Sequence, residues 1–455
     1  MSKQQTHTIS EYGDWQCLNS LEERAGLQTF LQDVWTKRAF PFADDWLTDD
    51  DDAEVIREEK KQPFLQFDGK EFRAKNFVGF IQTADVRIDI YPKVFKGQLE
   101  DKKGMVQHLF YWLSYCSKVR FPFLQSDLDV DNIDSLPELL IFLIINEIKT
   151  QVNSTPFSMY EQKEEVMTTP RGKIDFKNYI KNGLSSGNWQ NIDCIHEPFV
   201  YDNRVNQIIK YVCRLLQNMT KLSENRQMLD DVIFVLDEVE DRECTANDVD
   251  SVKLSPLFSA YTDILRWCRM ILEQQTYSCE HYDSMQWCFL LPMEYVFEDF
   301  ITGFIKRHFS DKWKVRPQAQ DKYLSENPQA FQMRHDILLE SKDKVKRKII
   351  LDTKYKLRTK NDFTDAKKGV SQNDMYQMVS YGLRRGCRDL YLLYPNTAND
   401  KLSEISTFNV KPEIEGIPPL SIHAVELPFW SLDSFERLSH SLIEFLEKYI
   451  KFKDC

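Results

Sequence analysis

Residues 331–357 constrain the fold of this chain more than any other stretch. Two short apolar runs flank a polar turn at 341–348, a pattern that predicts a β-hairpin. Side chains alternate between the two faces of a strand, so Asp352 and Lys354 share one face. Asp336 begins the apolar part of the first strand and can meet Asp352 across the pair. Because these charges are costly to bury on an apolar hairpin, the pattern indicates a bound divalent cation, and magnesium prefers such carboxylate oxygens.

The rest of the chain predicts a multidomain protein of the α+β or α/β class. Its 455 residues suggest two or three domains. We expect a strand-rich N-terminal domain at 1–103, a mainly helical middle region at 104–285 and a C-terminal domain at 286–455. The order helix, hairpin, helix, strand after residue 286 favours a mixed sheet flanked by helices in this last domain.

Composition and motifs exclude several classes of site. The net charge of -12 argues against indiscriminate coating of nucleic acid, which needs a basic surface. The ten cysteines form no Cys-x-x-Cys pair, so neither a zinc ribbon nor a disulfide framework is indicated. No Gly-x-x-x-x-Gly-Lys-Ser/Thr motif occurs, so we expect no direct nucleotide binding through such a loop. The polar start lacks the apolar core of a signal peptide, and no apolar run could span a bilayer, so we expect a cytoplasmic protein without membrane association.

Phosphodiester hydrolysis gives the residues of the hairpin defined roles. Asp336 and Asp352 would hold magnesium, or manganese in its place, with the backbone carbonyl of Thr353 as a further ligand. Lys354 would orient or deprotonate a metal-bound water, or stabilise charge in the transition state. The tripeptide Asp-x-Lys is weak evidence by itself. It also occurs at residues 101–103, 175–177 and 365–367, where surface charge is the simpler interpretation.

Two predicted helices add candidate catalytic residues. A helix at 291–304 can bring Glu298 to the metal or its water, and the alternative is a solvent-facing acid of that helix. A helix at 374–385 carries Gln377 on a polar stripe. From there Gln377 can fix Lys354 or a phosphate by a hydrogen bond, and the alternative is an ordinary surface amide.

Several motifs together carry a resemblance to a known family. In the hairpin they are Met333-Arg-His-Asp336 and Ile-Leu-Asp352-Thr-Lys354-Tyr-Lys. Along the rest of the chain they are Ile9-Ser-Glu-Tyr-Gly, Ile88-Asp-Ile-Tyr-Pro92-Lys93, Arg171-Gly-Lys-Ile-Asp175, Glu197-Pro-Phe-Val-Tyr-Asp202-Asn-Arg-Val-Asn206, Phe297-Glu298 and Asp374-Met-Tyr376-Gln377. The hairpin resembles the nuclease core of the PD-(D/E)xK superfamily. Its surroundings are similar to the McrC family, the nuclease subunit of the McrBC 5-methylcytosine-dependent restriction system. One departure is His335, which stands where the family usually has the Pro that shapes the strand.

The resemblance implies a subunit with two tasks. Its N-terminal domain, 1–103, would dock on a ring of a McrB-like AAA+ GTPase and stimulate GTP hydrolysis. Its C-terminal domain would cut double-stranded DNA, while the partner would bind the nucleotide and recognise the modified base. Two alternatives stay open: a catalytically inactive activator or adaptor of the GTPase, and a stand-alone PD-(D/E)xK nuclease. The complete acid–acid–lysine set disfavours the first, and the acidic net charge disfavours the second.

Overall fold

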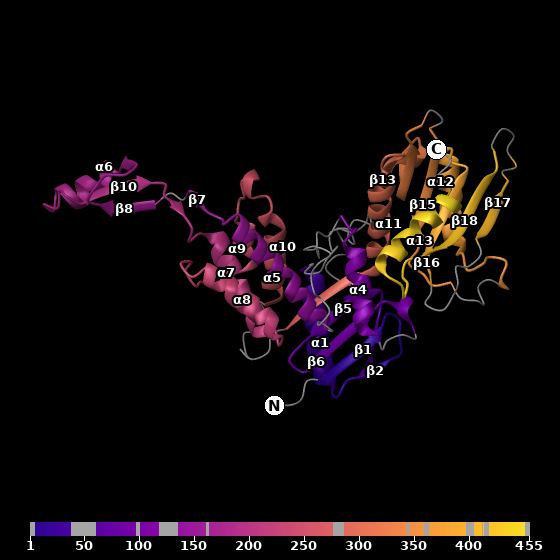
Figure 1. Ribbon diagram of the computed structural model, residues 1–455, viewed down its shortest axis with the longest axis horizontal. Helices are drawn as coiled ribbons and strands as arrows, with labels where there is room; N and C mark the ends of the chain where they lie inside the picture. Colours follow the sequence, from indigo (N-terminus) through magenta and orange to yellow (C-terminus); the bar gives the residue numbers. More distant parts are fainter. Residues whose placement is uncertain are drawn as a thin grey trace. The chain divides into compact units, whose positions relative to one another are not determined.

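The computed structural model describes most of the chain, as two compact units (Figure 1). The described residues are 5–37, 61–96, 101–117, 135–160, 163–275, 286–343, 346–358, 364–396, 405–411, 413 and 418–450. One unit consists of residues 1–136 together with 286–455, and the other of residues 137–285. The break after residue 285 coincides with a boundary expected from the sequence. Residues 1–103, expected as a domain of their own, instead share a unit with 286–455, and so does helix α4 (Lys102–Leu113) that follows them.

The N-terminal residues are rich in strands, as expected. Their larger sheet has the order β1 (Gln5–Ser10), β6 (Val86–Tyr91), β5 (Phe77–Gln82) and β12 (Trp287–Pro292). β1 and β6 run parallel, whereas β5 is antiparallel to both of its neighbours. A smaller sheet has the order β2 (Gln16–Cys17), β4 (Glu71–Ala74) and β3 (Leu65–Asp68). Helix α1 (Leu21–Thr36), capped by Ser20, contributes its apolar face to the core beneath the strands.

Strand β12 reaches this sheet from a distant part of the sequence. Leu290 pairs with Gly79 of β5, where the two backbones approach closely. Gly79 has a φ of 139°, and a Cβ at this position would lie 1.8 Å from the carbonyl oxygen of Phe289. Only glycine fits these two requirements. A fragment that ended at residue 285 would therefore lack one strand of the N-terminal sheet.

Residues 286–455 form the mixed sheet flanked by helices that the sequence predicts. The order of its six strands is β13 (Trp313–Glu326), β14 (Gln329–Ser341), β15 (Lys348–Thr353), β16 (Asp389–Pro395), β18 (Leu420–Leu427) and β17 (Ser406–Val410). β14 is antiparallel to β13 and β15, the strands β15, β16 and β18 run parallel, and β17 is antiparallel to β18. Its helices are α11 (Met293–Phe309), α12 (Gln372–Arg385) and α13 (Phe435–Tyr449). α11 lies against β13 and β15, and α12 lies against β13, β16 and β18 (Figure 1).

The unit of residues 137–285 is less uniformly helical than expected. Its helices are α5 (Leu136–Ser154), α7 (Arg204–Met219), α8 (Ser223–Val235), α9 (Ala246–Asp250) and α10 (Tyr261–Gln275). Asn203 caps α7 by accepting a hydrogen bond from the amide of Asn206. Short strands also occur, as a sheet of β8 (Lys163–Met167), β10 (Ile192–His196) and β9 (Lys173–Ile174) and as a pair of β7 (Met159–Tyr160) and β11 (Phe199–Val200). The turn α6 (Phe176–Asn178) and a π-helical turn (Tyr179–Leu184) complete this part.

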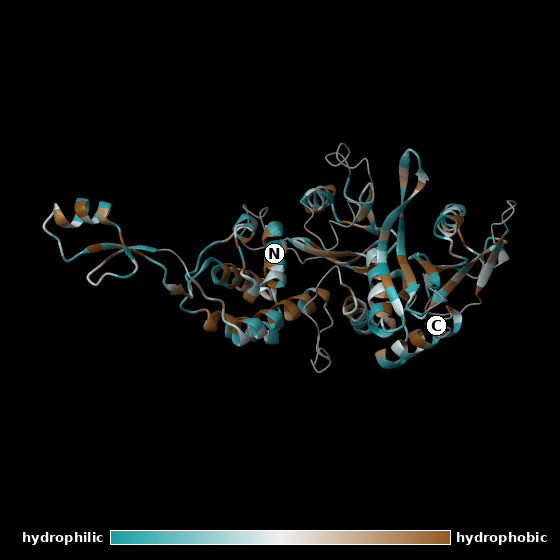
Figure 2. Cartoon of the chain, turned by 90° about the horizontal axis from the view of Figure 1, so that it is seen from above, coloured by the Kyte–Doolittle hydropathy of each residue, from teal (hydrophilic) through white to brown (hydrophobic). Residues whose placement is uncertain are grey.

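Residues 159–199 expose many large apolar side chains. Trp189, for example, is 69% exposed. The others are Met159, Tyr160, Val166, Phe176, Ile180, Leu184 and Phe199. Figure 2 shows brown apolar residues among teal polar ones along this segment. Within the described parts of the chain, no helix combines the length and apolar character that a membrane crossing requires.

Candidate functional site

The ends of β14 and β15 bring two acids together. The ladder between these strands ends at the pair Ile337 and Leu351, so Asp336 and Asp352 lie one position further along. The backbone amide and the hydroxyl of Thr353 donate to Asp336 Oδ2 over 2.7 and 2.8 Å. Both acids therefore lie at the same end of the hairpin, which agrees with the pairing expected from the sequence.

Asp352, which is buried, forms an ion pair with the half-buried Lys354. Asp352 is 1% exposed, and its Oδ2 lies 2.8 Å from Lys354 Nζ. Burial and the negative charge of Asp336 raise the pKa of Asp352 to about 7, although Lys354 opposes this shift. Burial by itself would lower the pKa of Lys354, but the neighbouring carboxylates of Asp352, Asp336 and Asp374 raise it above its usual range. The lysine is therefore charged, and one ammonium does not balance the acids around it.

Helix α12 adds a third carboxylate and an amide to this group. The hydroxyl of Ser371 caps the helix by accepting from the amide of Asp374 over 3.1 Å. Asp374 Oδ1 lies 3.7 Å from Lys354 Nζ, and its Oδ2 accepts a hydrogen bond from Lys356 Nζ over 3.3 Å. Gln377 Oε1 accepts from Lys354 Nζ over 3.3 Å, so the expected hydrogen bond between these two residues is present. Our sequence analysis gave Asp374 no role, although it lies three residues before Gln377 on the same helix.

A chain of hydrogen bonds connects Gln377 to Glu298. Gln377 Nε2 donates to the hydroxyl of Tyr381 over 2.7 Å, and this hydroxyl donates to the backbone carbonyl of Arg334. The side chain of Arg334 donates to Gln318, whose amide in turn donates to Glu298. Glu298 is 9% exposed, so it is not the solvent-facing acid that was the alternative interpretation. Tyr381 lies on the same helical stripe as Gln377, as its spacing indicates, whereas Gln318 carries no sequence signal because a glutamine in a strand is common.

The donor set suits a hard divalent cation. Asp336 and Asp352 supply carboxylate oxygens. The raised pKa of Asp352 means that its ionised form is unfavourable here, and a bound cation would stabilise that form. Among the described residues, no group of three or more His, Cys, Asp or Glu has an arrangement that could hold a metal ion. A cation held by these two acids would take its other ligands from water, from substrate phosphate or from a backbone carbonyl such as that of Thr353.

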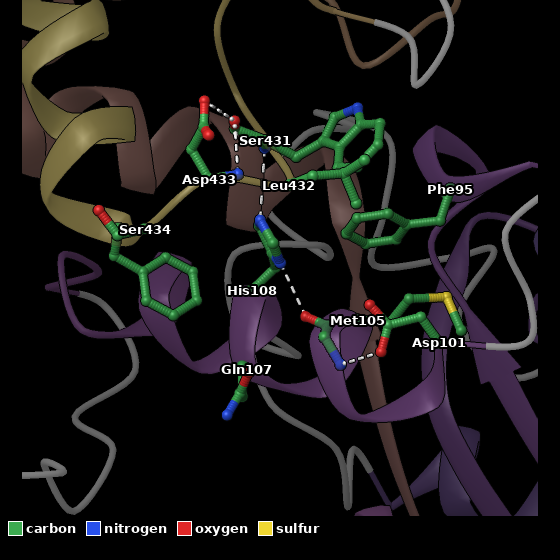
Figure 3. Close-up of a pocket in the computed structure, with 12 residues that line it drawn as sticks. Phe95, Asp101, Met105, Gln107, His108, Ser431, Leu432, Asp433 and Ser434 are labelled. Atoms are coloured by element: carbon green, nitrogen blue, oxygen red, sulfur yellow. Dashed lines mark hydrogen bonds between the residues drawn. The ribbon is translucent and has the colours of Figure 1, made fainter.

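A separate cavity of about 300 Å³ lies between α4 and the segment before α13 (Figure 3). Phe95, His108 and Trp430 are among the side chains that line it. His108 Nδ1 lies 2.7 Å from the carbonyl oxygen of Gly104, and the amide of Ser431 donates to Nε2 over 3.4 Å. Burial also lowers the pKa of His108, so its ring is neutral and both nitrogens are bonded to the backbone. The acids at the ends of β14 and β15 do not line this cavity.

Removal of the Tyr381 hydroxyl should weaken the hydrogen-bond chain. We expect Tyr381→Phe to lower the free energy of unfolding by about 1 kcal/mol, because the half-buried amide of Gln377 and the carbonyl of Arg334 lose a partner. Tyr376→Phe on the same helix is the matched control, because Tyr376 is exposed. Urea unfolding followed by circular dichroism measures both variants. An equal effect of the two substitutions would contradict a specific role for Tyr381.

Comparisons with known proteins place the chain in a family. A family model described as McrBC 5-methylcytosine restriction system component matches residues 72–395. The fold is similar to a chain of a refined half-complex from a tetradecameric assembly of Thermococcus gammatolerans McrB AAA+ hexamers with bound McrC, with a TM-score of 0.70, 17% identity and coverage of 97% of this chain and 100% of that chain. A chain of the Thermococcus gammatolerans McrBC complex is similar over 66% of this chain and 87% of that chain, with a TM-score of 0.49 and 18% identity. No curated protein matches the chain. Because the family model spans most of the sequence, as the resemblance of its motifs predicted, the chain belongs to the McrBC 5-methylcytosine restriction system component family.

Proposed function

We propose that this chain is the endonuclease subunit of a modification-dependent restriction complex, with a PD-(D/E)xK core in residues 286–455. The observation that carries the proposal is the convergence of Asp336, Asp352 and Lys354 at the ends of two paired strands. The packing of apolar strands does not need these charges, and burial makes them costly. A catalytically inactive adaptor of a GTPase would not require them, so the arrangement favours an active enzyme over that alternative.

The residues around the ion pair divide the chemistry of phosphodiester hydrolysis among themselves. Magnesium, or manganese in its place, would be held by Asp336, Asp352 and the Thr353 carbonyl, and would supply charge that polarises the phosphate and acidifies a bound water. Lys354 lies beside these acids with its ammonium fixed by Gln377. Because neighbouring carboxylates raise the pKa of Lys354, we assign it stabilisation of negative charge on the phosphate rather than deprotonation of water.

Glu298 has a supporting role in this proposal. Its bond to Gln318 joins Glu298 to the hydrogen-bond chain that passes through Arg334 and Tyr381 to Gln377. Partly buried polar networks of this kind fix the rotamers of the residues that they connect. We therefore assign Glu298 the task of holding Gln377, and through it Lys354, in one orientation.

The proposed partner is a McrB-like AAA+ GTPase ring, whose GTP hydrolysis this chain stimulates. The similar solved structure contains McrB AAA+ hexamers with bound McrC. Among the described residues of the expected docking domain, 1–103, the exposed large apolar side chains are Tyr12 and Leu21. Residues 159–199 expose a larger set, and exposed apolar patches mark protein contacts. We therefore place the main partner contact in residues 159–199, and double-stranded DNA at the acids of β14 and β15.

Metal binding should depend on the two strand-end acids. We expect the isolated chain to bind Mn²⁺, as measured by the loss of its free-ion electron paramagnetic resonance signal. Asp336→Asn and Asp352→Asn should each weaken this binding by about 10-fold or more, because each removes a carboxylate ligand. Asp365→Asn is the control, because Asp365 is an exposed acid of another Asp-x-Lys tripeptide. Equal Mn²⁺ affinity in all variants would remove these acids from the metal site.

Cleavage should be lost without loss of the fold in variants of the ion pair. We expect Asp352→Asn and Lys354→Ala to reduce magnesium-dependent cleavage of 5-methylcytosine-containing plasmid by about 100-fold or more, because each removes a group that acts at the scissile phosphate. The thermal midpoint should change little in Asp352→Asn, since this change removes one of several like charges. Both variants should still stimulate GTP hydrolysis by the AAA+ partner.

Lys367→Ala supplies the matched control for these variants, because Lys367 is an exposed lysine of an Asp-x-Lys tripeptide in the same unit. It should cleave as the unchanged chain does. Undiminished cleavage by Lys354→Ala would remove this lysine from the mechanism. Joint loss of cleavage and GTPase stimulation at an unchanged thermal midpoint would show that one set of residues serves both tasks.

Partner binding should depend on the exposed apolar residues of the 159–199 segment. We expect Trp189→Ser to weaken co-elution with the AAA+ partner and to lower GTP turnover, because a large exposed aromatic side chain is a typical anchor of an interface. Phe234→Ser is the control, because Phe234 is 80% exposed in the same unit but lies on α8. If Tyr12→Ser weakened binding and Trp189→Ser did not, the docking site would be in residues 1–103 instead.

A further inference from the structure

We propose that Glu11 is a positioning residue for DNA cleavage, which fixes the segment directly after β15 that carries Lys354, through a hydrogen bond to Tyr355. The inference rests on the proposed function, because it concerns the same lysine. It extends that function by making a residue near the start of the chain part of the support of the nuclease site.

The central contact is a buried hydrogen bond between two distant segments. Tyr355 directly follows Lys354, and its hydroxyl donates to Glu11 Oε2 over 2.8 Å. The same carboxylate oxygen accepts from the backbone amide of Lys93 over 3.0 Å. Glu11 is 2% exposed, and burial raises its pKa to about 7. Burial raises the pKa of Tyr355 as well, so the tyrosine keeps its proton and acts as the donor.

The N-terminal sheet places Glu11 and Lys93 side by side. The parallel pair β1 and β6 ends with Ser10 opposite Tyr91, and the amide of Glu11 donates to the Tyr91 carbonyl over 3.0 Å. Tyr12 then turns the chain with a φ of 52°, in the left-handed region. The carboxyl ends of two parallel strands therefore meet at Tyr355. These residues belong to the motifs at 9–13 and 88–93, which the nuclease chemistry by itself does not explain.

The ring of Tyr355 is held on several sides. Lys93 Nζ lies 4.1 Å from the ring centroid, a cation–π distance, and also donates to Asn76 Oδ1 over 3.3 Å. Phe297 of α11 lies 5.9 Å from the same ring, centroid to centroid, and Phe429 lies 6.3 Å from it. With its hydroxyl and its ring both in contact, Tyr355 has one orientation.

A fixed Tyr355 restricts the backbone of Lys354. The amide of Lys354 donates to the Leu393 carbonyl over 2.8 Å, and its own carbonyl accepts from the amide of Lys356 over 2.7 Å. Lys354 lies between these two bonds, directly after β15, so the position of Tyr355 determines the direction in which the Lys354 side chain points. Lys354 Nζ must lie 2.8 Å from Asp352, and small misplacement of a catalytic group costs rate steeply. Glu11 therefore acts on the reaction through geometry, without contact to the substrate.

The test compares variants that remove one hydrogen bond each, in the full chain assembled with its AAA+ partner. Tyr355→Phe removes only the hydroxyl and keeps the ring, and Glu11→Ala removes the acceptor. Glu11→Gln restores an oxygen acceptor at nearly the same shape. Tyr111→Phe is the matched control, because its hydroxyl bonds Ser439 Oγ over 2.7 Å elsewhere in the same unit. The measurements are kcat and KM for cleavage of a 5-methylcytosine-containing plasmid, together with the thermal midpoint.

We expect Tyr355→Phe and Glu11→Ala each to lower kcat by about 10-fold, with little change in KM, because the ground-state contacts with DNA are unaffected. Glu11→Gln should recover most of the rate, and Tyr111→Phe should cleave as the unchanged chain does. The double variant Glu11→Ala with Tyr355→Phe should be no slower than either single variant, since both remove the same bond.

Several results would overturn the proposal. Unchanged kcat in Tyr355→Phe and Glu11→Ala, while Lys354→Ala is inactive, would refute the positioning role and leave the proposed function intact. A loss of rate that followed the thermal midpoint in all variants, Tyr111→Phe included, would reduce Glu11 to a structural residue. If the unchanged chain and Lys354→Ala cleaved equally, the proposed function and this inference would both be wrong.

Discussion

The stacking of Trp112 on Phe429 is a central contact of the unit formed by residues 1–136 and 286–455. The ring centroids lie 4.0 Å apart at an interplanar angle of 9°, and the indole of Trp112 donates to the backbone carbonyl of Phe429 over 2.8 Å. A buried tryptophan whose N–H is bonded combines a large apolar area with a fixed orientation. Phe429 also lies 4.9 Å from Phe297 of α11, centroid to centroid. Helix α4 is thereby packed against α11 and the segment after β18, which helps to hold residues 1–136 and 286–455 in one unit.

Electrostatics imposes a second constraint at the ends of β14 and β15. Asp336, Asp352 and Asp374 lie around the ammonium of Lys354. Burial and the neighbouring Asp336 raise the pKa of Asp352, and the carboxylates raise the pKa of Lys354 against the effect of its burial. In a chain selected only for stability, apolar residues at these positions would serve better, because buried ion pairs seldom repay their desolvation. A cation and a phosphate that bind together would complete the balance. The unfavourable charge of this cluster is therefore the strongest physical argument for a functional site.

Local patterns predicted the hairpin and the Gln377 contact, because strand alternation and helical spacing are properties of short stretches of sequence. The pairing of β12 with β5 could not be predicted in this way. The run at 287–292 looks like the approach to a helix, and its partner strand is about two hundred residues away. Strand β8 was missed because its sequence, Lys-Glu-Glu-Val-Met, shows no alternation of apolar and polar residues. Asp374 belongs to a motif of the sequence analysis but had no assigned role, because an acid in the first turn of a helix is ordinary and only the fold brings it to Lys354.

The connection between β12 and α11 explains why the six-stranded sheet and its helices are not an independent module. β12 ends at Pro292 and α11 begins at Met293, whose amide donates to the Asn76 carbonyl of the N-terminal sheet over 3.3 Å. The same short segment thus completes one sheet and begins the helix that packs against the other.

Phe297, one turn along α11, then contacts the ring of Tyr355. The N-terminal sheet consequently reaches the end of β15 by two routes, one covalent through α11 and one through the hydrogen bond of Glu11. A fragment that began at residue 286 would lack β5, the partner of β12, and would also lack Glu11. The acids and the lysine of the site therefore depend on a second sheet as well as on their own.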